Sequence, residues 1–115
     1  MMNLKISALE FVEEAKNGNI SVEDFIGKTL ERIDSVEDKL HAFLSINDKA
    51  LDQARELAKQ IKSGQGVGSC FGMPISIKAN LCIKNSNTTC ASNMLENFIA
   101  PYDATIVSKF KTQNT

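Results

Sequence analysis

The chain has 115 residues, of which 43% are hydrophobic and 23% charged, a composition typical of a soluble globular protein and unlike that of a disordered one. Its formal net charge of −1 gives no basic footprint for nucleic acid and no polybasic anchor, so we expect neither direct nucleic-acid binding nor membrane association. Three cysteines without C-x-x-C spacing and a single histidine argue against a disulfide framework or a metal site and favour a cytoplasmic protein.

Two helices are predicted in residues 1–37, which we interpret as a helical hairpin. Ser7 and Glu10 have the spacing of a capping box, so a helix should begin after Ser7 and end at Asn17-Gly18-Asn19. Ser21 begins a second cap pattern, and the apolar residues that follow predict a helix to about Ser35 or Val36. The apolar face of the first helix is predicted to comprise Ala8, Leu9, Phe11, Val12 and Ala15.

Residues 38–115 have the pattern of the start of an α/β sheet. A short apolar run, Ala42 to Ile46, predicts a buried strand, and a helix with one apolar face follows from about Asp48 to Lys62. A glycine-rich loop then leads to a second strand that ends at Lys78. Such a β-α-β unit favours two parallel strands with a right-handed crossover.

The last third of the chain is less regular. Residues 85–92 are rich in hydroxyl and amide side chains and are predicted to form a loop. A final helix is expected after Pro101-Tyr102-Asp103, with Asp103 as its cap and an apolar face of Ile106, Val107 and Phe110. Because that face and a two-stranded sheet both need further cover, we expect these residues to be the amino-terminal fragment of a larger α/β protein.

Lys78 ends the second predicted strand, where a turn residue would be ordinary. Met73, Ile75 and Ile77 recur at period two and should share one face, which puts Lys78 on the other face with Pro74 and Ser76. Burial makes a lysine easier to deprotonate, and a neutral lysine can act as a base. The alternative interpretation is a lysine that ends an edge strand in water.

Three arrangements could supply a nucleophile. A Ser-His-Asp triad would need His41, the only histidine, and the chain has no G-x-S-x-G elbow. Ser76 and Lys78 would lie about 7 Å apart on one strand face, within reach of a serine-lysine dyad, although Ser76 is better interpreted as a hydroxyl that fills the second face of the sheet. Cys70, Cys82 and Cys90 have no evident base beside them and are better interpreted as small buried or loop thiols.

Three blocks in order resemble the amidase-signature family. They are residues 72–78, ending in Lys78, residues 88–98, beginning Thr-Thr-Cys-Ala-Ser, and residues 101–105, Pro-Tyr-Asp-Ala-Thr. Within that family the likeness is greatest to the A subunits, which are the glutaminases of tRNA-dependent amidotransferases. The resemblance implies that residues 1–115 are the amino-terminal part of a single α/β domain, in which a helical amino terminus precedes a large mixed sheet.

The resemblance also implies a chemistry and its partners. The family uses two serines and a lysine, and the family lysine matches Lys78; both serines lie beyond the equivalent of Thr115, so the fragment alone should be inactive. The complete assembly would contain subunits B and C, use glutamine and misacylated tRNA as substrates, and consume ATP with magnesium, while this part holds no cofactor. Alternatives are a fragment of a free-standing amidase for another amide and a non-catalytic binding module.

The sequence departs from the family at two places. Ala79 stands where the family usually has an aspartate after the lysine, which removes a carboxylate that would help set the properties of Lys78. The ending, residues 111–115, lacks the family's usual continuation into a glycine turn and another strand. Both departures suggest a gene fragment or a decaying copy.

Overall fold

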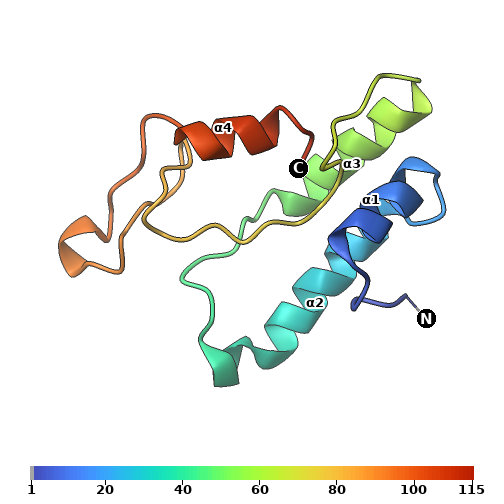
Figure 1. Ribbon diagram of the computed structural model, residues 1–115. Coiled ribbons are helices and arrows are strands. Elements are labelled where there is room, and N and C mark those ends of the chain that lie inside the picture. The colour runs from blue at the N-terminus through green and yellow to red at the C-terminus, as the bar shows by residue number, and fades with distance from the viewer. Residues whose placement is uncertain (1) are drawn as a thin grey trace. The chain divides into compact units, whose positions relative to one another are not determined.

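The computed structural model describes residues 2–115 and is helical. The helices are α1 (Ala8–Lys16), α2 (Val22–Leu40), α3 (Ala50–Lys62), the 3-10 turn η1 (Asn93–Leu95) and α4 (Thr105–Lys111), as Figure 1 shows. The chain divides into two compact units: the first runs to Pro74 and also contains Gln113–Thr115, and the second is Ile75–Thr112. None of the helices in the described residues is both long and apolar enough to cross a membrane.

The helix starts follow the predicted caps. The Ser7 hydroxyl accepts the backbone N–H of Glu10 at 3.3 Å, and the Ser21 hydroxyl accepts that of Asp24 at 3.2 Å. These bonds satisfy amide groups that a helix start otherwise leaves without a partner. α2 continues beyond its predicted end near Val36 as far as Leu40, where His41 adopts a left-handed conformation with φ 48° and closes the helix.

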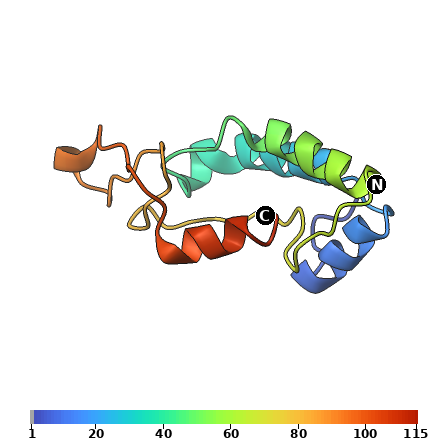
Figure 2. The same cartoon turned by 90° about the horizontal axis from the view of Figure 1, so that it is seen from above.

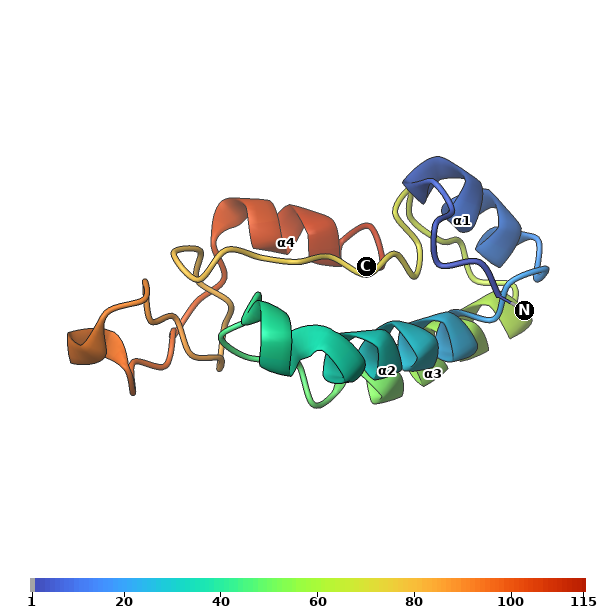
Figure 3. The same ribbon diagram turned by 90° about the horizontal axis from the view of Figure 1, so that it is seen from below.

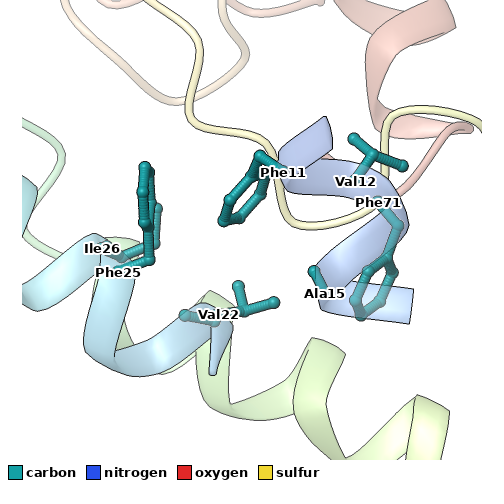
Figure 4. Close-up of a cluster of buried hydrophobic side chains, with 8 residues drawn as sticks. Phe11, Val12, Ala15, Val22, Phe25, Ile26 and Phe71 are labelled. Atoms are coloured by element: carbon teal, nitrogen blue, oxygen red, sulfur yellow. The ribbon is translucent and has the colours of Figure 1, made fainter. Parts of the chain in front are cut away.

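The core of the first unit joins all three of its long helices, and Figure 2 shows α2 and α3 side by side. The rings of Phe11 and Phe25 lie with centroids 4.4 Å apart and tilted by 40°. Ala8 and Leu9 are predicted on the inner face of α1, but both are exposed, Leu9 at 81%. Only Phe11, Val12 and Ala15 of that predicted face are buried. The buried cluster, most of which is labelled in Figure 4, comprises Phe11, Val12, Ala15, Val22, Phe25, Ile26, Ala54 and Phe71.

Gly72 allows the loop after α3 to reach this core. Its φ is +68°, and a Cβ there would lie 2.7 and 2.9 Å from the two methyl carbons of Val22. Both the left-handed backbone and the close approach therefore require glycine. The neighbouring Phe71 is fully buried as a result, at 0% exposure.

Gln113 and Asn114 form hydrogen bonds with the same loop. The backbone N–H of Gly68 donates to the Asn114 side-chain oxygen, and that of Gly72 donates to the Asn114 carbonyl, both at 2.7 Å. The amide and hydroxyl of Ser69 both donate to the Gln113 side-chain oxygen. Asn114 has φ 62°, so it adopts the left-handed conformation that a glycine turn would supply.

The predicted start of a sheet is not confirmed. No β-strand occurs between residues 2 and 115, and Figures 1 and 3 accordingly draw no arrow. The Ala42–Ile46 run, expected to be buried, is exposed throughout, with Leu44 at 70%. A β-strand is defined by backbone hydrogen bonds to a neighbouring segment, and neither apolar run has such a neighbour. The amide of Phe43 donates to the Glu37 carboxylate instead. α3 does separate the two runs, although it begins at Ala50 and not at Asp48.

Candidate functional site

Lys78 lies in the segment whose two faces were predicted from the sequence. Exposure alternates from residue 73 to residue 78: Met73, Ile75 and Ile77 are half-buried, while Pro74, Ser76 and Lys78 are exposed. The period-two prediction is therefore confirmed even though no strand forms. Among the described residues, the side chain of Lys78 is not enclosed, and Ser76 lies on the same exposed face.

A turn at residues 88–92 holds the backbone that follows Lys78. The N–H of Cys90 donates to the carbonyl of Ala79 at 3.1 Å, and the N–H of Ala91 donates to the Thr89 hydroxyl at 3.3 Å. Cys90 and Ala91 both have left-handed backbones, with φ 49° and 54°. Two such residues in succession, neither of them glycine, cost roughly 1–2 kcal/mol each. The predicted loop is thus an ordered turn that contacts the residue after Lys78.

Thr88 begins this turn and was not singled out by its sequence pattern. It is 4% exposed, and its amide donates to the carbonyl of Phe98 at 3.0 Å. Its hydroxyl is the one buried side-chain oxygen within residues 2–115 that has no hydrogen-bond partner. A buried hydroxyl left in this state costs about 1–3 kcal/mol. A threonine in a run of polar residues carries no sequence signal of burial.

Asp103 does not cap α4, contrary to the prediction. Ala104 occupies the cap position, and no side chain caps the first turn. The Asp103 carboxylate accepts the backbone N–H of Lys84 at 2.8 Å and the ammonium of Lys111 at 2.8 and 2.9 Å. The hydrogen bond from Lys111, followed by that from the Lys84 amide, lowers the pKa of Asp103 below its ordinary value of 3.8. Asp103 therefore links the backbone of residue 84 to the last turn of α4 through hydrogen bonds.

The other candidate nucleophiles and ligands are His41 and the three cysteines. His41 ends α2 through its left-handed backbone. The thiols are free, with Cys70 and Cys82 half-buried and Cys90 exposed. Interaction with the neighbouring Cys82 thiol raises the pKa of the Tyr102 hydroxyl. No three metal-ligating side chains of residues 2–115 lie close enough together to hold an ion.

Comparison with known proteins shows which family the chain matches. The family model described as Amidase matches residues 24–114. The chain is 41% identical over 108 residues to the A subunit of glutamyl-tRNA(Gln) amidotransferase from Cenarchaeum symbiosum, and 42% identical over 112 residues to the protein of that name from Clostridium kluyveri. These alignments cover 94% and 96% of the chain but 22% and 23% of the relatives, so the chain spans under a quarter of their length.

A solved structure has the same fold as these residues. It is a chain of the vestigial protein complex that reveals the evolutionary origins of an s-triazine catabolic enzyme. The match has a TM-score of 0.88, covers 95% of this chain and 24% of the other, and shows 21% sequence identity. At this level of identity the match shows a shared fold and nothing about activity.

Proposed function

Because the chain belongs to the amidase family, we propose that it is the amino-terminal part of the glutaminase subunit of a tRNA-dependent amidotransferase. The observation that carries the proposal is the set of relatives named as A subunits of glutamyl-tRNA(Gln) amidotransferase, which match it at 39–42% identity over nearly its whole length in three organisms. Such an enzyme would convert misacylated Glu-tRNA(Gln), or Asp-tRNA(Asn), with ammonia from glutamine. The chain would act in the cytoplasm.

Lys78 is the residue to which we assign a catalytic role. Lys78 is exposed in the described residues, so this role requires that the rest of the full-length domain encloses it and favours its neutral form. The neutral amine would then accept a proton through a bridging serine, so that the nucleophilic serine attacks the side-chain carbonyl carbon of glutamine. The carbon-nitrogen bond then breaks, ammonia leaves, and water hydrolyses the acyl-enzyme to glutamate. Two observations support this role: Lys78 ends the two-faced segment, and the turn at Cys90 holds the next residue, Ala79.

The remaining machinery would come from outside these residues. The serines and the oxyanion loop would follow them in the full-length protein, and subunits B and C would bind misacylated tRNA and use ATP with magnesium. The described residues offer no cluster of metal ligands that fits magnesium, so we assign no step to that ion here. Ala79 replaces the family's usual aspartate, and restoring a carboxylate with Ala79→Asp should leave glutamine hydrolysis equal or improve it.

A hybrid enzyme tests the proposal. Residues 1–115 would replace the matching part of the Clostridium kluyveri relative, made together with that enzyme's other subunits, and ammonia release would be measured with glutamine, asparagine and simple amides. We expect turnover of glutamine by the hybrid and none by the 115-residue chain alone, because a proton relay without a nucleophile has nothing to activate. Preference of the hybrid for another amide would support the free-standing amidase instead.

A further inference from the structure

The backbone on the carboxyl side of Lys78 is held by two hydrogen bonds. The carbonyl of Lys78 accepts the N–H of Leu81 at 3.0 Å, and the carbonyl of Ala79 accepts the N–H of Cys90 at 3.1 Å. Because both carbonyls are bonded, the two peptide planes that follow Lys78 are fixed in orientation. Both bonds join residues of the second unit to one another, so they do not depend on which surfaces the rest of the protein covers.

The turn that supplies the second bond has a costly backbone. Cys90 and Ala91 are both left-handed, with φ 49° and 54°, and neither is glycine. Glycine would adopt this backbone without steric cost, but it would also leave the turn free to adopt other conformations. Strain of this kind persists only where surrounding contacts hold it, and in folded proteins it is concentrated at functional sites.

Thr89 makes two of the contacts that hold this strained pair. Its hydroxyl accepts the N–H of Ala91 at 3.3 Å, and its carbonyl accepts the N–H of Ser92 at 2.8 Å. A threonine hydroxyl that bonds the backbone two residues further on stabilises a turn. The Thr89 carbonyl and the Cys90 N–H belong to one peptide group, so the same turn fixes the direction of the N–H that reaches Ala79.

The turn is also held on the side away from Lys78. The N–H of Thr88 donates to the carbonyl of Phe98 at 3.0 Å. Next to this bond, Asn87 and Ile99 form an antiparallel bridge. The turn therefore contacts the Lys78 segment from a base that is itself fixed.

We propose that Thr89 is a positioning residue for Lys78. Its hydroxyl holds the strained turn, the turn orients the backbone that follows the lysine, and that backbone directs the amine toward the bridging serine. This role rests on the proposed glutamine hydrolysis and adds to it a residue that acts through Lys78. Proton transfer needs the two groups within hydrogen-bond reach, and a displacement of about 1 Å can remove most of the rate.

In the hybrid enzyme, Thr89→Val and Thr89→Ser separate the hydroxyl from the shape of the side chain. Valine keeps the branched shape of threonine without the oxygen, whereas serine keeps the oxygen. We expect kcat for ammonia release from glutamine to fall about tenfold in Thr89→Val, with KM unchanged, and to stay at the parent value in Thr89→Ser. Thr29→Val is the matched control: it removes a hydroxyl that donates to the Phe25 carbonyl at 2.8 Å within α2, and it should leave kcat unchanged.

Combining Thr89→Val with Lys78→Ala tests whether Thr89 acts through the lysine. The residual ammonia release of Lys78→Ala should not fall further when Thr89→Val is added, because the amine that Thr89 positions is gone. A residue that merely supports the fold would lower turnover by the same factor in both backgrounds. Hydrogen exchange at the amides of Cys90 and Ala91 gives a readout independent of turnover, and it should become about tenfold faster in Thr89→Val but not in Thr29→Val.

The role of Thr89 is overturned if Thr89→Val retains the parent kcat, if it loses the same factor with and without Lys78, or if exchange at Cys90 and Ala91 is unchanged. It is also overturned if the Thr89→Val hybrid fails to assemble while Thr89→Ser assembles, since the hydroxyl would then serve folding. A large loss in Lys78→Ala with none in Thr89→Val would contradict the role of Thr89 alone. Undiminished turnover by Lys78→Ala would instead contradict the chemistry assigned to Lys78, and the role of Thr89 with it.

Discussion

Replacing Gly72 by alanine should destabilise the first unit more than the same replacement at Gly64 or Gly66. Two costs add at this position. A left-handed backbone costs a non-glycine residue about 1–2 kcal/mol, and forcing a methyl group into packed surroundings costs about 1–3 kcal/mol. The methyl group would meet Val22, which is 4% exposed and has little room to move. We expect a total loss of about 3 kcal/mol in the free energy of unfolding.

Other glycines of the same chain separate the two costs. Gly64 also has a left-handed backbone, at φ +73°, but a Cβ there meets nothing within 4 Å, so Gly64→Ala should show the backbone cost alone. Gly66 has neither constraint, and Gly66→Ala should be neutral or stabilise by about 0.4–1 kcal/mol. Urea unfolding followed by helical circular dichroism measures all three variants. Equal midpoints for Gly72→Ala and Gly64→Ala would refute the predicted clash with Val22.

Four further substitutions test particular contacts. Asp103→Asn should lower the unfolding temperature at neutral pH. Because folding lowers the pKa of Asp103, the difference between variant and parent should disappear as the pH falls through that lowered pKa. A difference that persists in stronger acid would contradict the contact between Asp103 and Lys111. Ser21→Ala should cost about 1 kcal/mol in urea unfolding, through loss of the cap of α2, and no loss would mean that the cap bond is not formed in solution. Phe11→Ala should cost about 3–5 kcal/mol, whereas Leu9→Ala, at an 81% exposed residue, should be nearly neutral; equal losses would place Leu9 in the core after all.

Local patterns predicted the helices and the two faces of the Lys78 segment. The Ser7 and Ser21 caps depend on bonds that span three residues, so the sequence spacing contains them completely. The alternation of exposure from Met73 to Lys78 follows from the geometry of an extended backbone, whether or not a neighbouring strand is present. In both cases the structure depends on residues that lie close together in the chain.

The sequence pattern could not predict contacts between residues that lie far apart in the chain. Asp103 has the sequence position of a helix cap, yet it binds Lys84 and Lys111. No local pattern predicts these two contacts. The bond between Asn114 and Gly68 spans 46 residues. One signal for it was present, because asparagine after a helix is a common substitute for glycine in the left-handed conformation. Ala42–Ile46 is exposed because no neighbouring strand covers it among the described residues, and the periodicity of the run does not show whether such a neighbour is present.

The role of Lys78 in glutamine hydrolysis is tested most directly by one comparison in the hybrid enzyme. Lys78→Ala should lower kcat for ammonia release by about 10²–10⁴-fold, the usual contribution of a general base. Lys109→Ala removes another exposed lysine, from α4, and should leave kcat unchanged. Undiminished turnover by the Lys78→Ala hybrid, or an equal loss in both variants, would show that Lys78 is not the proton relay.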